Sequence, residues 1–247
     1  MIRLKLKGVS KKYIIEDKEI TALEGIGFGV TKRESIAIVG PSGCGKTTLI
    51  RLIAGLEKAS GGEIYFHGKL LQGPDPRIMM IFQNFALLPW KTVRENVELG
   101  LLDIPENQRR EITEKYLKIV GMDGSAENYP RNLSSGGKQR VGIARALCRE
   151  PDILIMDEPF SSLDPLTARN LQNEILRYYH SKKLKPDVLM LITHNIQEAV
   201  YMADRIIVMG QNPGHIKADI KIELEKLRNM RDKRFQDYVD EVTSLIV

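Results

Sequence analysis

A glycine-rich run at residues 40–48 has the clearest chemical meaning in the sequence. It matches G-x-x-x-x-G-K-[ST], the pattern of a loop that wraps the phosphates of a nucleotide. Glycines let the backbone approach the phosphates, and the first N–H groups of a following helix attract their negative charge. Lys46 can reach the β- and γ-phosphates, and the Thr47 hydroxyl can bind Mg²⁺. The predicted nucleotide-binding residues are Gly40, Pro41, Ser42, Gly43, Cys44, Gly45, Lys46, Thr47 and Thr48.

Polar side chains follow three further apolar stretches of strand length. These stretches are residues 78–82, 153–156 and 188–192. Gln83 follows the first, Asp157 and Glu158 follow the second, and His194 lies just beyond the third. Ligands bind at the carboxyl ends of the strands in open α/β sheets, so we expect these side chains beside the phosphate loop. Asp157 is the candidate ligand of Mg²⁺, and Glu158 can orient or deprotonate an attacking water.

Two other features carry more than one interpretation. A glycine- and serine-rich loop at residues 133–137 precedes a helical pattern at residues 138–147. Such a loop can bind an anion at the helix N-terminus, but simple capping by Ser134 or Ser135 explains it as well. Tyr13 could stack on an adenine ring, and on residue types alone a tyrosine that packs on a neighbouring strand is the better explanation.

The elements around these residues indicate an α/β fold. Residues 35–39 and 47–53 read as the strand and the helix that flank the phosphate loop. Residues 2–9 alternate apolar and charged side chains, which predicts a half-exposed antiparallel strand. The predicted division is a sheet core of residues 1–83 and 151–223, an inserted helical subdomain at 84–150 and a C-terminal helical extension at 224–247.

Composition excludes several classes of protein. The 247 residues are 43% hydrophobic and 28% charged, which is typical of a globular chain. No apolar run approaches the length of a membrane span and the first residues do not form a signal peptide, so we expect a cytoplasmic protein. Cys44 and Cys148 lie far apart, which argues against a disulfide framework. The net charge of +5 suits nucleic acid or an anionic membrane, but a mildly basic solvated surface explains it better.

The stretch at residues 85–90 is apolar and contains both Pro89 and the only tryptophan, Trp90. It reads as a loop that presents apolar side chains. Such a loop can contact a partner protein or cap its own core, and the sequence favours neither explanation.

Taken together and in this order, the motifs resemble the nucleotide-binding subunit of ABC transporters along nearly the whole chain. Residues 40–48 match the Walker A motif, Gln83 the Q-loop, residues 133–137 the signature motif, and Asp157 with Glu158 the Walker B motif and catalytic glutamate. The D-loop matches Ser162, Leu163 and Asp164, and His194 matches the switch histidine. The resemblance places Tyr13 where the family stacks adenine. It implies a P-loop NTPase core with a mainly parallel sheet, an N-terminal antiparallel β subdomain and an inserted helical subdomain.

The resemblance also implies an ATPase that works as a homodimer. Two copies would sandwich two ATP molecules, with Mg²⁺ bound by Thr47, Gln83 and Asp157. Lys46, Gln83, Glu158 and His194 would act on the γ-phosphate and its attacking water. The signature loop of the opposite copy would complete each site through Leu133, Ser134, Ser135, Gly136 and Gly137. Permease subunits would be contacted near residues 83–90, a solute-binding protein would take part indirectly, and the subunit would lie on the cytoplasmic face of the membrane.

One motif departs from the family pattern. The signature usually reads Leu-Ser-Gly-Gly followed by Gln or Met, whereas here Ser135 stands where glycine is usual and Gly137 where the larger residue is usual. A Cβ at Ser135 would cost about 1 kcal/mol or more if that position requires a positive φ. We therefore expect retained function, and the affinity of the dimer is the property that this change would affect.

Within the family, residues 85–93 and 211–216 look most like subunits of importers for nitrate, sulfonate and taurine. The same group includes importers of thiamine-precursor pyrimidines, which gives an alternative solute. A different class is a soluble ABC-type ATPase that acts on nucleic acid or ribosomes, but the coiled-coil insertion or second ATPase domain usual there is missing, so no nucleic acid is expected. A scaffold that binds ATP without hydrolysing it is opposed by the complete set of Asp157, Glu158 and His194.

Overall fold

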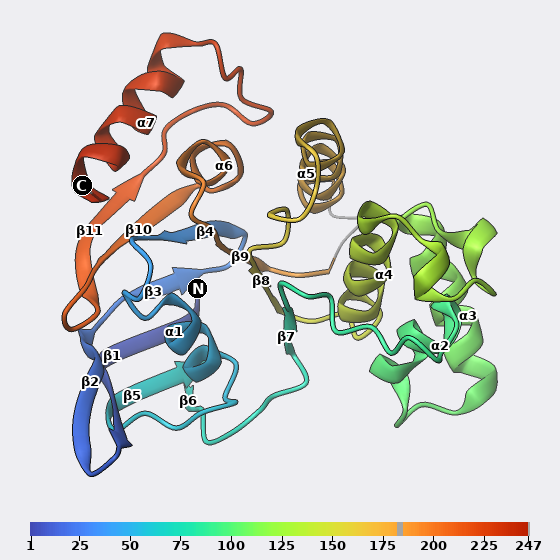
Figure 1. The fold of residues 1–247 in the computed structure, drawn as a ribbon, viewed down its shortest axis with the longest axis horizontal. Coiled ribbons are helices and arrows are strands. Elements are labelled where there is room, and N and C mark those ends of the chain that lie inside the picture. The colour runs from blue at the N-terminus through green and yellow to red at the C-terminus, as the bar shows by residue number, and fades with distance from the viewer. Residues whose placement is uncertain (182–184, 247) are drawn as a thin grey trace. The chain divides into compact units, whose positions relative to one another are not determined.

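The computed structural model describes residues 1–181 and 185–246, and the chain divides into two compact units (Figure 1). One unit comprises Met1–Ile78 and Asp187–Val247, and the other comprises Met79–Pro186. Each unit buries apolar side chains of its own and carries a different set of the predicted site residues.

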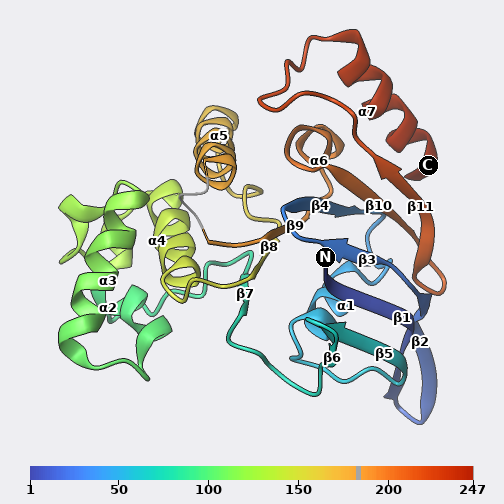
Figure 2. The same cartoon turned by 180° about the vertical axis from the view of Figure 1, so that it is seen from behind.

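The first unit contains the sheet that carries the phosphate loop. Its strands are β4 (Glu34–Val39), β9 (Val188–Ile192), β10 (Arg205–Gly210) and β11 (His215–Lys221), in the order β11-β10-β4-β9. β4 pairs in parallel with β9 and β10, and β11 is the antiparallel edge strand. Helices α6 (Ile196–Met202) and α7 (Lys233–Ile246) lie on one face, and α1 (Lys46–Ile53) lies on the other (Figure 1, Figure 2). Because both faces are covered, the central strand β4 is apolar without a break from Ile36 to its end at Val39.

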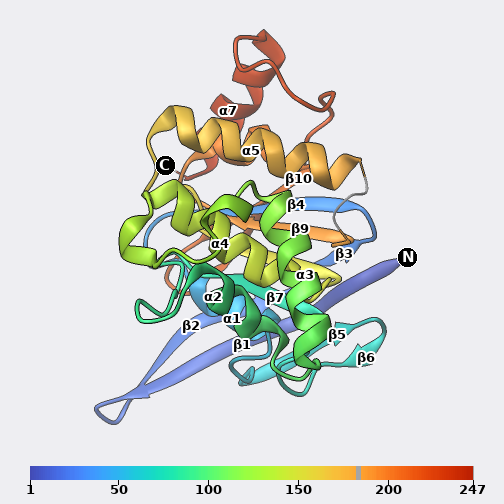
Figure 3. The same ribbon diagram turned by 90° about the vertical axis from the view of Figure 1, so that its right-hand side faces the viewer.

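A second sheet in the same unit is antiparallel, as the alternation of the N-terminal residues predicts. It consists of β1 (Ile2–Ile15), β2 (Lys18–Ile26), β3 (Gly29–Thr31), β5 (Gly61–Phe66) and β6 (Lys69–Leu70). Leu4 and Leu6 are buried, whereas Lys5 and Lys7 are exposed. β1 continues to Ile15 rather than ending near residue 9, because it pairs with β2 in a long hairpin (Figure 3).

The second unit is mostly helical. It contains α2 (Val93–Glu98), α3 (Glu106–Ile119), α4 (Ser135–Leu147) and α5 (Pro165–His180), with short 3₁₀ turns at Leu99–Leu101, Asp123–Ser125 and Pro130–Asn132. Strands β7 (Ile78–Ile81) and β8 (Ile153–Asp157) are neighbours. Thr92 and Glu95 form a capping box at the start of α2, and Pro165 is the first residue of α5.

The fold predicted from the sequence is confirmed in its class and in most of its elements. Three strands or helices are absent from the prediction, β6, β11 and α6, and each has a weak sequence signal. β6 has only two residues, the edge strand β11 alternates half-buried and exposed residues, and α6 has only seven residues, too few for a clear helical period. The residue boundaries predicted for the core, the helical subdomain and the extension divide the chain differently from the two compact units and stay a prediction.

No helix within residues 1–181 and 185–246 is both long enough and apolar enough to cross a bilayer.

Candidate nucleotide site

The phosphate loop lies between β4 and α1 in the first unit. Gly45 precedes α1 with φ at 90°, a left-handed conformation that favours glycine, and a Cβ there would lie 2.5 Å from Leu23 Cδ2. A Cβ on Gly40 would lie 2.6 Å from the Met209 carbonyl oxygen. No side chain in the described part of the chain caps α1, so its first N–H groups can donate to phosphate oxygens.

Lys46 lies folded back across this loop. Its Nζ donates to the Gly40 carbonyl at 2.8 Å and to the Pro41 carbonyl at 3.0 Å. Hydrogen bonds to an ionised acceptor are stronger than those to a neutral carbonyl, so a phosphate can displace these contacts. Cys44 beside it is fully buried, and neither cysteine forms a disulfide.

His194 leaves the sheet at the same edge as the phosphate loop. β9 and β4 are parallel neighbours, with Ile192 opposite Ile38 and with the Thr193 N–H donating to the Ile38 carbonyl. The next residue, Asn195, caps α6 by accepting from the Glu198 N–H at 3.1 Å. The structure therefore brings His194 and the phosphate loop to one edge, as the positions at the strand ends predict.

Tyr13 is anchored to the end of the helix that follows the phosphate loop. Its hydroxyl donates to Glu57 Oε2 at 2.6 Å and lies 3.5 Å from Thr48 Oγ1. Lys11 Nζ lies over the ring, 4.9 Å from its centroid, and 3.3 Å from Glu57. Burial and the hydrogen bond to Glu57 raise the pKa of Tyr13, which keeps the phenol protonated as a donor. Glu57 and Lys11 carry no motif, so sequence reasoning missed both.

In the second unit, Gln83 and Glu158 meet. Gln83 follows β7 and Glu158 follows β8, and Gln83 Nε2 donates to Glu158 Oε2 at 3.2 Å. Asp157 is the last residue of β8. Glu158 has φ at 44°, and its carbonyl accepts from Ser161 Oγ at 3.0 Å, so a tight turn holds it in a conformation that costs a non-glycine residue about 1 kcal/mol. Strain of this kind concentrates at functional sites.

Residues 133–137 form the start of α4. Ser134 is the N-cap and accepts from the Gly137 N–H at 3.1 Å. Ser135 is the first residue of the helix and is not among the residues with positive φ, so its Cβ causes no backbone strain. A Cβ on Gly136 would lie 2.9 Å from Thr167 Cγ2 on α5. Ser135 therefore does not carry the conformational free-energy cost of a positive φ. The reason is that the helix begins three residues earlier than predicted and includes Ser135.

The predicted D-loop residues Ser162, Leu163 and Asp164 lie immediately before α5. Asp164 caps that helix, and its Oδ1 accepts from the N–H groups of Leu166 and Thr167 at 3.2 and 3.0 Å. The carboxylate thus has a structural role in this unit.

Two polar side chains form hydrogen bonds with the backbone of the apolar loop at residues 85–90. The sequence analysis did not identify either of them. Asn96 is fully buried, and it accepts from the Leu88 N–H and donates to the carbonyls of Leu88, Lys91 and Thr92. Arg145 donates to the carbonyls of Phe85 and Ala86 at 2.6 and 2.7 Å. Trp90 is 70% exposed, so the loop is a fixed support for an exposed aromatic side chain.

Comparisons with known proteins agree on one family. A family model described as ABC transporter matches residues 23–161. The chain is 40% identical over 247 residues to an uncharacterized ABC transporter ATP-binding protein of Methanocaldococcus jannaschii, covering 99% of this chain and 91% of that protein. It is 37% identical over 232 residues to the aliphatic sulfonates import ATP-binding protein SsuB of Bacillus cereus, covering 94% and 91%.

Similar solved structures belong to the same family of ATP-binding cassettes. The ATP-binding cassette MJ0796, described as a dimer in a post-hydrolysis state bound to ADP and Pi, gives a TM-score of 0.78 at 30% identity, covering 90% of this chain and 100% of that chain. The family model spans more than half of the chain, and the match to the Methanocaldococcus jannaschii relative covers almost all of both chains. The chain therefore belongs to the ABC transporter family, as an ATP-binding subunit with the ATPase activity of that family.

Proposed function

We propose that the chain is the ATPase subunit of an importer, in which two copies enclose two ATP molecules. Each ATP would lie between the phosphate loop of one copy and residues 133–137 of the other. The observation that carries the proposal is that one chain has two helix N-termini suited to phosphate: α1, which has no side-chain cap within the described residues, and α4, where the Ser134 hydroxyl adds a donor. Structural neighbours described as dimeric cassettes support the dimer.

In the proposed reaction, water attacks the γ-phosphorus of ATP in line with the leaving oxygen. Phosphoryl transfer needs positioning and charge neutralisation rather than a covalent intermediate. Lys46 would neutralise charge on the β- and γ-phosphates, and Glu158 would accept a hydrogen bond from the water. Gln83 would hold the Glu158 carboxylate through the contact of 3.2 Å, and His194 would donate to the γ-phosphate.

The oxygen donors of this chain fit Mg²⁺. Within residues 1–181 and 185–246 there is no cluster of three or more His, Cys, Asp or Glu side chains that could enclose a metal ion. Mg²⁺ is commonly bound by one or two protein oxygens together with phosphate oxygens and water, so a full protein cage is not expected. We assign Thr47, Asp157 and Gln83 as the protein ligands, and the bound ion would neutralise phosphate charge.

The proposed solute is a small anion such as nitrate, a sulfonate or taurine. The 37% identity to the sulfonate import protein supports this choice, and a thiamine precursor is the alternative within the importer group. The exposed loop around Trp90 would contact the permease and place the subunit on the cytoplasmic face of the membrane, with a solute-binding protein acting from the other side. The motor subunit itself does not touch the solute.

The permease contact can be tested with Trp90→Ala. We expect the isolated variant to hydrolyse ATP at the parental rate, because Trp90 lies in neither predicted nucleotide-binding loop. We also expect it to lose most of its recovery with membrane subunits when the tagged chain is purified from solubilised membranes of cells that express the whole transporter. Leu102→Ala is the matched control, since Leu102 is 65% exposed but lies outside the loop. Full recovery of the Trp90 variant with its membrane partners would contradict the proposed contact.

The adenine contact can be tested with Tyr13→Phe and Glu57→Ala. Each change removes one side of the hydrogen bond from the Tyr13 hydroxyl to Glu57, so we expect each to raise the Kd for ATP by about 3- to 10-fold with little change in kcat. The double variant should be no weaker than the single ones, because both act through one contact. Isothermal titration with ATP measures the affinities.

The chain provides a matched control for this experiment. Tyr65 donates to Glu63 Oε2 at 2.8 Å and has Lys7 Nζ 4.6 Å from its ring centroid, so it repeats the arrangement away from the phosphate loop. Tyr65→Phe should leave ATP affinity unchanged. Equal affinities for Tyr13→Phe and the parent protein would show that Glu57 does not position the tyrosine for adenine.

A further inference from the structure

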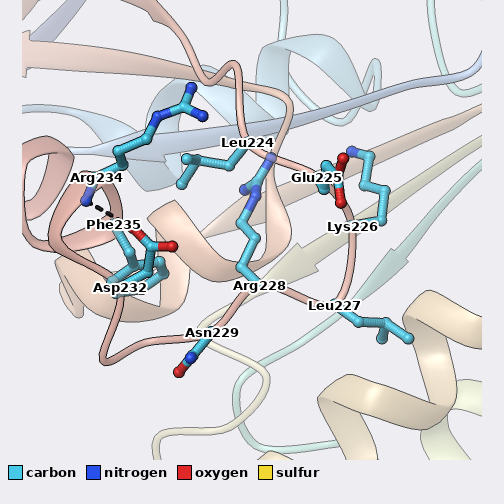
Figure 4. Close-up of a pocket in the computed structure, with 9 residues that line it drawn as sticks. All are labelled: Leu224, Glu225, Lys226, Leu227, Arg228, Asn229, Asp232, Arg234 and Phe235. Carbon is cyan, nitrogen blue, oxygen red and sulfur yellow. Dashed lines mark hydrogen bonds between the residues drawn. The ribbon is translucent and has the colours of Figure 1, made fainter.

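The segment that joins β11 to α7 encloses a cavity that no part of the proposed ATPase mechanism uses. The cavity has a volume of about 330 Å³ and is lined by residues of the first unit alone (Figure 4). Three cations line it: Lys226, Arg228 and Arg234. Only one of them, Arg228, is buried, with 6% of its surface exposed.

One edge of the Arg228 guanidinium has a structural role. Its Nη1 donates to the Ala203 carbonyl at 2.6 Å and also to the Val200 carbonyl. These are the carbonyls at the C-terminal end of α6, where a positive charge is stabilising. Arg228 therefore fastens the C-terminal segment to the helix that begins just after His194.

The other edge of the same guanidinium is unpartnered. Within the described residues, neither Nε nor Nη2 of Arg228 has a hydrogen-bond partner, and both atoms are buried. These two N–H groups point in parallel from one edge, which is the geometry that binds two oxygens of a carboxylate, sulfonate, sulfate or phosphate. A buried cation with unused donors is costly, so this edge is suited to an anionic acceptor.

The acidic groups nearby are used by other partners or lie at the surface. Lys226 contacts Asp204, whose Oδ2 also accepts from the Ser35 N–H and hydroxyl. Asp232 Oδ1 accepts from the Arg234 N–H at 2.8 Å, and Glu225 is exposed. Burial lowers the pKa of Arg228 to about 10.

We propose that the cavity is a binding site for a small oxyanion, held side-on by Nε and Nη2 of Arg228 and attracted by the neighbouring cations. The site lies at the C-terminal end of α6 and is separate in sequence and in the fold from the phosphate loop at α1. Bound anion would tie the segment before α7 to α6, so the stability of this part of the unit would depend on the oxyanion concentration.

The probe for the test is sodium sulfate, titrated calorimetrically into the full chain at constant ionic strength. The protein is first saturated with Mg²⁺ and ADP, so that the phosphate loop is filled and cannot account for sulfate binding. We expect one saturable site in the parent protein. Arg228→Lys keeps the charge but lacks the parallel pair of donors, and it should bind sulfate at least about ten-fold more weakly.

Three further measurements make the result unambiguous. The ADP titration that precedes each sulfate titration shows whether the variant is folded, and it tests the proposed nucleotide site separately. Leu224→Trp narrows the cavity while leaving Arg228 in place, and it should also weaken sulfate binding. Ethanesulfonate, phosphate, nitrate and acetate in parallel titrations identify the preferred oxyanion.

The proposal is overturned if the parent protein shows no saturable sulfate site once ADP is bound, or if Arg228→Lys binds sulfate as tightly as the parent.

Discussion

Glu158→Gln is expected to lower the rate of ATP hydrolysis by about 10²- to 10⁴-fold while leaving the Kd for ATP nearly unchanged. The amide has the shape of the carboxylate but cannot accept a proton from the attacking water. The contact with Gln83 can persist, because Gln83 Nε2 can also donate to an amide oxygen. Phosphate release at saturating ATP measures the rate, and isothermal titration measures the affinity.

The matched control is Glu111→Gln. Glu111 is exposed on α3 and lies outside the predicted site, so its neutralisation makes the same change in net charge without touching the chemistry. We expect parental hydrolysis from this variant. Hydrolysis by Glu158→Gln at the parental rate would contradict the role of Glu158 as the residue that activates water.

Lys46→Ala is expected to weaken ATP binding by about 100-fold or more. Two charge-assisted hydrogen bonds to the β- and γ-phosphates are lost, each worth about 1.5 to 3 kcal/mol. The folded state should be little affected, because Lys46 Nζ contacts uncharged groups, the carbonyls of Gly40 and Pro41 and the Cys44 sulfur, and is not fully buried. Isothermal titration with ATP and a thermal unfolding curve together separate loss of binding from loss of structure.

Lys58→Ala serves as the control for this change. Lys58 is exposed just beyond the helix that follows the phosphate loop, and its backbone carbonyl, which accepts from Lys11, remains after the substitution. Its ATP affinity should equal that of the parent. An unchanged affinity in Lys46→Ala would mean that the loop does not hold the phosphates in the way proposed.

The phosphate loop, the buried strands and the polar strand ends could be predicted because their signals are local. Residues 40–48 carry a complete pattern, and β9 was expected at the residues where it lies. The approach of Gln83 to Glu158 followed from a general property of parallel sheets, that strand ends gather at one edge.

The supporting residues could not be predicted, because they act across long separations in the sequence. Glu57 meets Tyr13 from 44 residues away, and Arg145 reaches Phe85 from 60 residues away. Neither has a motif, and an exposed charged residue was the reasonable expectation for each. Asn96 in α2 is similar, since only the folded loop reveals that its amide is fully buried.

Ser135 illustrates a third case, in which comparison of motifs alone misleads. Its mismatch with the usual signature suggested a strained backbone, but the start of α4 gives this position an ordinary helical conformation. Whether a side chain is tolerated depends on where a helix begins, and boundaries are the least certain part of any prediction from sequence.

The most direct test of the central claim is the mass and nucleotide content of the Glu158→Gln protein with Mg²⁺ and ATP, measured by light scattering and by analysis of the bound nucleotide. The account predicts a particle of twice the 28.0 kDa chain mass that contains two ATP molecules and returns to the single-chain mass when ATP is replaced by ADP. A protein that binds ATP fully and keeps the mass of a single chain would contradict it.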